Sequence, residues 1–256
     1  PPGPTSNECL QGQANALDID RPRQILFDGI TQSYFVMDPD EHRIYRIHWE
    51  DNLRYAFIGT GEYCNETNPY SCGDGYQGSQ LSFGYMESMA FDPSGYLYVS
   101  DNKRIRKITL ANTGSLGDSC DASGEGLVSE TVIGGNTCPL GSCDINGETG
   151  LNASLDYGVV LALDDNQNLY FTNNNNIYKV SSTGSGISGN EVISMVVGCP
   201  DGATCPDNSN NPLFVSLSGP SDINFDQNGN LWITESFRFQ IRRLNASTDQ
   251  LEVVAG

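Results

Sequence analysis

The sequence predicts an all-β fold that is built from four copies of one four-stranded unit. Short runs of β-branched and aromatic residues alternate with turn residues along the 256-residue chain, which is typical of strands. No segment keeps a helical period over a dozen residues. The same order of four runs also recurs every 62 to 72 residues, and a repeat of this length indicates a modular architecture.

The first strand of each unit is a short apolar run that ends at or next to an Asp. In the last three units this Asp opens a turn rich in Asn, Gln, Gly or Ser, which tolerate positive φ or bond their own backbone. The four first strands are predicted at residues 23–28, 86–91, 158–163 and 221–226.

The second strand carries an aromatic residue at its centre in every unit. It is centred on residues 34–36, 97–99, 169–171 and 231–233, and the polar residues Asp38, Asp101, Asn173 and Glu235 follow it. The third strand is predicted at residues 44–47, 105–108, 177–180 and 241–244. The fourth strand closes each unit at residues 57–59, 133–134, 197–198 and 254–256.

A lone four-stranded sheet has two apolar faces and cannot cover both. Stacking such sheets face to face around an axis covers them, which predicts a β-propeller with the central aromatic residues wedged between neighbouring blades. Residues 15–256 are expected to form it, with four complete blades at about 23–59, 86–134, 158–198 and 221–256. Residues 1–14 are expected to be a Pro-rich linker remnant and an incomplete disulfide loop, in an excerpt of a larger protein.

The clearest copy of the repeat is residues 95–108, Gly-Tyr-Leu-Tyr-Val-Ser-Asp-Asn-Lys-Arg-Ile-Arg-Lys-Ile. This pattern resembles the NHL-repeat family of propellers, and residues 42–44, His-Arg-Ile, are similar to the same motif. The resemblance extends from about residue 15 over nearly the whole chain, and it implies a parent ring of about six blades. Members of that family include protein-binding and RNA-binding modules as well as lyases, so the resemblance specifies the fold and leaves the function open.

Charge and hydropathy exclude two classes of function. Thirteen basic residues against 32 acidic residues give a net charge of −19, which repels nucleic-acid phosphates and anionic lipid head groups. No stretch approaches the roughly 18–20 apolar residues that a membrane span needs. We therefore expect no nucleic-acid partner and no direct membrane insertion.

Cysteines and glycosylation sequons indicate a secretory route. Six cysteines form three close doublets whose spacings fit zinc knuckles poorly, so short disulfide loops are favoured over metal sites. Three N-x-[ST] sequons support an extracellular or cell-surface location. The predicted disulfide residues are Cys64, Cys72, Cys138, Cys143, Cys199 and Cys205, and the predicted N-glycosylation sites are Asn65, Asn152 and Asn245.

Two cysteines lie outside the doublets. Cys9 stands where the second cysteine of another such loop would be, whereas Cys120 lies in a loop between a third and a fourth strand. These loops emerge on opposite faces of a blade, and bridged cysteines need Cα atoms within about 7 Å. We expect at least one of the two to bond outside this segment or to another molecule. An intrachain Cys9–Cys120 bond that wraps an edge stays open as the alternative.

Charged and metal-ligating residues each allow a structural and a functional interpretation. Basic residues on or beside the third strands could form an anion-binding ring, but pairing with the acidic residues after the second strands is favoured because the placement repeats. The basic residues are Arg43, Arg46, Lys103, Arg104, Arg106, Lys107, Lys179, Arg238, Arg242 and Arg243. The propeller lyases of the amidating type hold zinc with several histidines around the tunnel. This chain has only two histidines, His42 and His48, and both lie in one blade, which argues against that zinc site.

Calcium is a weaker expectation for the Asp/Asn-rich segments 164–168 and 173–176, because turn chemistry explains them without a metal. No catalytic motif is present, and neither catalytic nor cofactor-binding residues are assigned. The favoured function is a non-catalytic extracellular structural or adhesive module of a glycoprotein, whose partners are other protein subunits or matrix and cell-surface proteins. The alternative is a secreted metal-dependent hydrolase or lyase with its site at the central channel.

Overall fold

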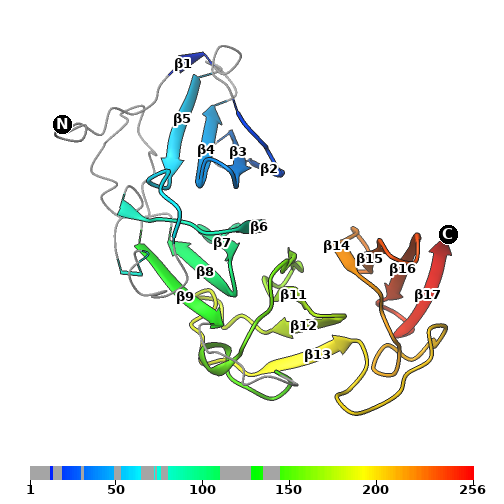
Figure 1. Cartoon of the computed structure of the whole chain (residues 1–256). Coiled ribbons are helices and arrows are strands. Elements are labelled where there is room, and N and C mark those ends of the chain that lie inside the picture. The colour runs from blue at the N-terminus through cyan, green and yellow to red at the C-terminus, as the bar shows by residue number, and fades with distance from the viewer. Residues whose placement is uncertain are drawn as a thin grey trace. The chain divides into compact units, whose positions relative to one another are not determined.

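A computed structural model describes residues 12–13, 19–29, 32–48, 53–64, 72, 74–75, 80–109, 128–134 and 145–256. Within these residues the protein is all-β, in four antiparallel sheets, with a three-residue 3₁₀ turn at Gly150–Asn152 (Figure 1). Contacts divide the chain into two compact units, Pro1–Asn102 with Arg106–Glu130, and Lys103–Ile105 with Thr131–Gly256. The predicted all-β propeller class with four four-stranded blades is confirmed.

Blades 1 and 2 follow the predicted strand order. Blade 1 also contains β1, Gly12–Gln13, which pairs with Leu53 and Arg54 and adds a fifth strand where the sequence predicted only a linker and loop. The remaining strands of blade 1 are β2 Gln24–Asp28, β3 Ser33–Asp38, β4 Arg43–His48 and β5 Leu53–Ile58. Those of blade 2 are β6 Met86–Asp92, β7 Tyr96–Asp101, β8 Arg104–Thr109 and β9 Val128–Gly134.

Blades 3 and 4 repeat this order without an added strand. The strands of blade 3 are β10 Leu161–Leu163, β11 Leu169–Asn173, β12 Asn176–Val180 and β13 Ile193–Val197. Those of blade 4 are β14 Pro220–Phe225, β15 Leu231–Glu235, β16 Gln240–Asn245 and β17 Gln250–Ala255. In every blade the fourth strand begins before the few closing residues that the sequence indicated.

A bulge recurs where the third strand pairs with the fourth. The register shifts between Ile44 and Tyr45, between Ile177 and Tyr178, and between Ile241 and Arg242. The glycine that ends each fourth run has a positive φ, for example +88° at Gly134, whose missing Cβ would collide with the backbone at the start of β8. The recurrent terminal glycine is therefore required by a backbone conformation and a close approach that other residues disfavour.

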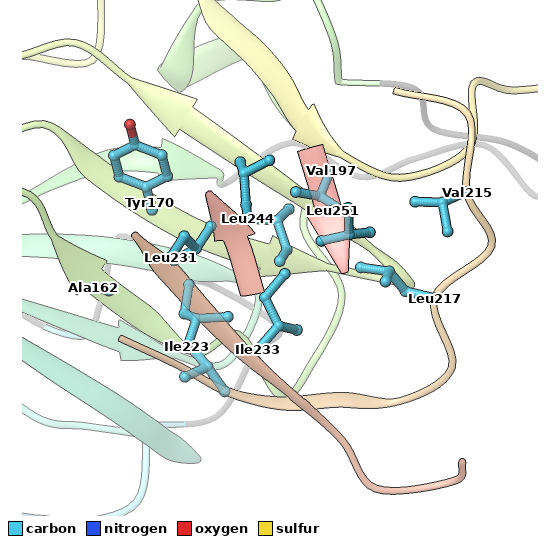
Figure 2. Close-up of a cluster of buried hydrophobic side chains, with 12 residues drawn as sticks. Ala162, Tyr170, Val197, Val215, Leu217, Ile223, Leu231, Ile233, Leu244 and Leu251 are labelled. Carbon is cyan, nitrogen blue, oxygen red and sulfur yellow. The ribbon is translucent and has the colours of Figure 1, made fainter. Parts of the chain in front are cut away.

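Each unit has its own apolar core between two blades. In the first unit the core joins β3, β4 and β5 to β6, β7 and β8. In the second unit Tyr170 and Val197 of blade 3 face Ile223, Leu231 and Ile233 of blade 4 (Figure 2). Burial of these side chains is the main favourable term for stacking the blades.

The central aromatic residue of the second strand reaches the neighbouring blade in both units. Phe35 stacks on Phe91 with ring centroids 6.1 Å apart, and Tyr170 meets Phe225 edge-on at 4.7 Å. These contacts place a large apolar side chain at the blade interface and agree with the wedge expected at those two positions. In blade 4 Trp232 is partly buried, and its indole Nε1 donates to Asp226 Oδ2 at 2.9 Å.

Candidate functional site

The polar residue that ends each second strand forms the same hydrogen bond in all four blades. Asp38, Asp101, Asn173 and Glu235, which we call the strand-end acceptors, accept a backbone N–H from the segment that enters their own blade. The donors are Asp20, Gly84, Asp156 and Ser218, at 2.9, 2.7, 2.8 and 2.7 Å respectively. Because a buried amide needs a partner, this bond fixes the connection to the first strand.

In blade 2 the strand-end acceptor pairs with a fully buried arginine. Arg106 Nη1 lies 3.1 Å from Asp101 Oδ2, and Nη2 lies 3.0 Å from Asp74 Oδ1. The same guanidinium donates to the carbonyl oxygens of Cys72 and Ser82 and to the hydroxyl of Ser129. One planar group with five donors thus joins β7, β8 and β9 to the loop that precedes the blade.

In blade 4 two arginines, Arg238 and Arg242, together form the corresponding bonds to the strand-end acceptor and the preceding loop. Arg242 Nε donates to Glu235 Oε2 at 2.5 Å, and its Nη2 donates to the carbonyl oxygen of Asp207. Arg238 Nη1 donates to Glu235 Oε1 at 3.1 Å and also bonds the carbonyl oxygen of Ser216, while its Nη2 reaches Asp207 Oδ1. The longer Glu side chain serves both arginines, and both hold the loop that leads into blade 4.

Blades 1 and 3 carry tyrosine where blades 2 and 4 carry the buried arginine. Tyr45 and Tyr178 are both buried directly after the bulge of the third strand. The Tyr178 hydroxyl accepts a hydrogen bond from Asn176 Nδ2 at 3.1 Å. Here Asn173 is a neutral strand-end acceptor, whereas Asp38 in blade 1 accepts the backbone amides of Asp20, Arg21 and Glu41.

The pairing interpretation of the basic residues therefore agrees with the structure at Asp101 and Glu235, but Asp38 binds amides instead of arginine.

The position after the buried Tyr or Arg carries a further cation in each blade. Lys179 lies over the Tyr170 ring and Arg243 over the Trp232 ring, at 5.4 and 5.6 Å from the centroids. Arg243 also pairs with Glu252. These cations are engaged within their own blades.

The Asp-rich turns satisfy their own carboxylates. Asp226 accepts the backbone amides of Asn228 and Asn230, the Asn230 side chain and the Trp232 indole. The Asn230 and Trp232 side-chain bonds hold the pKa of Asp226 well below its usual range. Asp164 accepts the corresponding bonds from Asn166 and Asn168, which is the turn chemistry that the sequence favoured over calcium.

Desolvation also acts on the central aromatic residue of blade 3. Burial raises the pKa of the Tyr170 hydroxyl, and the nearby Asp164 carboxylate adds to the shift by its charge and by a hydrogen bond. Tyr170 therefore stays neutral and donates to Asp164. This hydrogen bond stabilises the turn between the first two strands of blade 3, and it favours the neutral form of the tyrosine.

Of the two histidines, only the side chain of His42 lies within the described residues, and it is not brought together there with other metal ligands. His42 lies in the β3–β4 turn at φ 52°, with Nδ1 3.3 Å from the carbonyl oxygen of Gly84. His48 ends β4, and its side chain lies outside the described residues. Within the described ranges, no group of three His, Cys, Asp or Glu side chains could hold a metal ion.

The structure contains two of the three predicted doublet disulfides. Cys64–Cys72 and Cys199–Cys205 have Cα atoms 5.5 and 5.7 Å apart, within the range for a disulfide. The other cysteines, Cys9, Cys120, Cys138 and Cys143, lie outside the described residues, as does the sequon residue Asn65. The two remaining sequon residues, Asn152 and Asn245, lie in the 3₁₀ turn and at the end of β16.

Sequence reasoning missed a second role of the cysteine-containing loops. Segments that follow the second cysteine position bond the fourth strand of the blade they lead into. Gly75 N donates to the carbonyl oxygen of Ser129, Gly147 N to that of Ile193, and Leu251 N to that of Asn210. In blade 1 the β1–β5 pairing occupies the same place. The recurrence of a cysteine shortly before each bonding segment was a signal in the sequence, but the bonding partners are remote in the chain.

Comparison with known proteins places this architecture in a family. The family model described as "Teneurin NHL domain" matches residues 21–255. The chain belongs to this family. Human Teneurin-1 is 25% identical over 250 residues, which cover 91% of this chain and 8% of that protein. Zebrafish (Danio rerio) Teneurin-3 is 25% identical over 238 residues, covering 87% and 8% respectively. The teneurin NHL domain described here thus spans about 8% of the length of these relatives.

A solved structure also resembles this teneurin NHL domain in fold. An auxiliary nutrient binding protein from Bacteroides thetaiotaomicron matches with a TM-score of 0.53 and 13% sequence identity. The match covers 89% of this chain and 46% of that protein. At such low identity the likeness concerns the fold alone. No helix in the described part of the teneurin NHL domain is long and apolar enough to cross a bilayer.

Proposed function

We propose that this teneurin NHL domain is a non-catalytic, extracellular protein-interaction module of a larger glycoprotein. The observation that carries the proposal is the use of the four strand-end acceptors. Polar groups at the strand ends of a propeller are candidates for chemistry, yet here each one holds a backbone amide of its own blade, and Asp101 and Glu235 also hold buried arginines. The strand-end acceptors thus use their hydrogen-bonding oxygens to hold the loops of the domain, which supports a role other than binding a substrate.

The loops that this network fixes are suited to protein contacts. The disulfide loops before blades 2 and 4 are tied to buried arginines through the carbonyl oxygens of Cys72 and Asp207. In the loop before blade 4, residues 199–218, the disulfide and these bonds hold the backbone, so it loses little conformational entropy when it binds a partner. We propose that the domain assembles with other protein subunits, or with matrix and cell-surface proteins, through these loops and the blade faces.

An extracellular location is proposed from the disulfides and the sequons. Disulfides persist mainly in oxidising compartments. In the structure two disulfides each close a short loop. Glycans at Asn65, Asn152 and Asn245 remain predictions, together with the pairing of the other four cysteines. We also propose that the domain needs no metal or other cofactor, because the turn at Asp226 uses its carboxylate oxygens for hydrogen bonds.

The test uses the secreted, disulfide-bonded domain coupled to beads. We expect the beads to bind purified matrix or cell-surface proteins at physiological salt, and binding to weaken when the loops before blades 2 and 4 are replaced by short Gly-Ser linkers. Beads that carry the domain unfolded by reduction and alkylation provide the control. A domain that stays monomeric and binds nothing across the panel would contradict the proposal. Stoichiometric metal in elemental analysis would instead favour the enzyme alternative.

A further inference from the structure

An exposed tyrosine stands at the entrance to blade 2. Tyr85 directly follows Gly84, the amide donor to the strand-end acceptor Asp101, and its side chain is 63% exposed. Its ring meets the ring of Tyr63 edge-on with centroids 5.6 Å apart, and Tyr63 is itself 44% exposed and contacts the His42 ring. Large exposed aromatic side chains that lie together are typical of interaction surfaces.

The backbone beneath this aromatic pair is held rigidly. Tyr85 N donates to Asn102 Oδ1, and Tyr85 O accepts from Asn102 N, both at 2.8 Å. Tyr63 pairs with buried Phe83 in an isolated bridge and precedes the disulfide-bonded Cys64. The two exposed rings therefore project from a fixed scaffold, so little backbone order would be lost on binding.

Blade 3 indicates what a tyrosine at this register position can bind. Tyr157 follows Asp156, whose amide bonds the strand-end acceptor Asn173, so Tyr157 is the equivalent of Tyr85. Lys103 Nζ lies over the Tyr157 ring, 4.8 Å from its centroid. Among the described residues, no cationic group lies over the Tyr85 ring. Both rings are exposed, by 48% at Tyr157 and 63% at Tyr85, but the Tyr157 ring already has a cation of the chain itself over it.

The charge of the domain favours a cationic ligand. Acidic residues outnumber basic ones by 32 to 13, so a basic partner is attracted before contact. The ring face of a tyrosine also attracts an ammonium or guanidinium group through its quadrupole. We propose that Tyr85, with Tyr63 beside it, is a docking site for an arginine or lysine side chain on a basic segment of a partner protein. This inference rests on the proposed interaction function and names one of its surfaces.

The test titrates the domain with a synthetic peptide of alternating arginine and glycine, at about 0.15 M salt to screen diffuse attraction. Tyrosine ring resonances are followed by NMR, and affinity is measured by calorimetry. Matched variants are Tyr85→Phe, which keeps the aromatic face, and Tyr85→Leu, which keeps apolar volume without it. We expect Tyr85→Phe to bind within about twofold of the native domain and Tyr85→Leu to lose about two- to fivefold in affinity.

Two controls separate this site from general attraction. Tyr157→Leu alters the equivalent ring that Lys103 already covers, and we expect it to leave affinity unchanged. A citrulline–glycine peptide keeps the shape of the side chain without its charge, and we expect it not to bind. Equal losses for Tyr85→Phe and Tyr85→Leu, no loss for either, or shifts confined to other tyrosines would overturn the inference.

The outcomes also distinguish the inference from the proposed function. If partner proteins bind the native domain and the Tyr85→Leu variant equally well, the interaction function stands and this docking site is wrong. If the arginine peptide depends on Tyr85 but no protein partner binds the domain, the interaction function fails although the site binds cations. Binding to anionic or neutral lipid vesicles through Tyr85 would overturn the choice of a basic protein segment.

Discussion

Blades 2 and 4 differ from blades 1 and 3 at one buried position of the third strand. Arg106 and Arg242 occupy it in the first pair, and Tyr45 and Tyr178 occupy it in the second. All four side chains are almost completely buried and follow the recurrent bulge or its equivalent position. The same backbone therefore accommodates either a charged group with five donors or a neutral group with one hydroxyl.

This comparison indicates the role of the buried charge. Arg106 reaches five acceptors in two other strands and the preceding loop, whereas the Tyr178 hydroxyl accepts a hydrogen bond from Asn176, two residues before it in the same strand. A buried ion pair is weak evidence for stability by itself, because desolvation opposes the attraction. Its value here lies in fixing several loop carbonyls with one group. Between blades 2 and 3 the acceptor changes with it, from Asp101 beside arginine to Asn173 beside tyrosine, whereas in blade 1 three backbone amides satisfy Asp38 beside Tyr45.

Exchanging the two residue types should produce the largest effect. Arg106→Tyr leaves Asp101 buried without its cation, so we expect the free energy of unfolding to fall by about 3–5 kcal/mol. Denaturant unfolding followed by circular dichroism measures the loss, and hydrogen exchange should locate it in β7 and β8. Arg243→Ala removes a partly exposed pair with Glu252, and this control should cost less than about 1 kcal/mol.

A double variant sharpens the same test. Asp101→Asn combined with Arg106→Tyr gives blade 2 the neutral pair that blade 3 has at Asn173 and Tyr178. We expect it to be more stable than Arg106→Tyr alone, because no uncompensated carboxylate remains buried. If the double variant were no more stable than the single one, the charge of Asp101 would not explain the loss.

Removing a disulfide should have the next largest effect. Replacing Cys199 and Cys205 by Ser opens a short loop, and loop-closure entropy predicts a loss of about 2 kcal/mol. Exchange should accelerate at Leu251 N, which donates to Asn210 in that loop, before it accelerates in β11. Equal acceleration in both places would contradict a local role for the loop in holding the fourth strand of blade 4.

Much of the fold could be predicted from the sequence because its signals are local. The alternation of apolar runs and turns located all sixteen blade strands, and the aromatic wedge holds for Phe35 and Tyr170. The Asp-rich turns were also interpreted correctly at Asp226, since Asp, Asn and Gly at such spacing bond their own backbone. These features depend on neighbouring residues in the chain.

The rest depended on contacts between remote segments. The strand-end acceptors were recognised as a recurrent position, but their amide donors 17 or 18 residues earlier were not. Pairing with arginine was expected at Asp38 as well, where three amides satisfy the carboxylate instead. The two hydrogen bonds that hold the Tyr85 backbone to Asn102 join residues that no local pattern connects.

A charge added to a tyrosine blade tests the converse of the first exchange. Asn173→Asp places a carboxylate in a buried position that has no arginine, and we expect a loss of about 1–2 kcal/mol at neutral pH. Desolvation raises the pKa of such a group in the folded state, so the folded protein binds the extra proton and the loss should shrink as the pH falls toward about 4. Asn174→Asp, at the exposed neighbouring position, should leave stability nearly unchanged at every pH.

The smallest expected effect compares the first turns of blades 3 and 4. Trp232 donates to Asp226 and helps to hold the pKa of that carboxyl low, so ionised Asp226 stabilises the folded state above its unfolded pKa. This contribution is lost as the pH falls below about 4 through the depressed folded pKa. Trp232→Phe removes one donor and should move the Asp226 carboxyl titration to higher pH in carbon NMR, which makes the acid loss of stability shallower. The amides of Asn166 and Asn168, in the corresponding turn of blade 3, should keep their chemical shifts, and a change there would mean that the substitution acts through the whole unit instead of the indole bond.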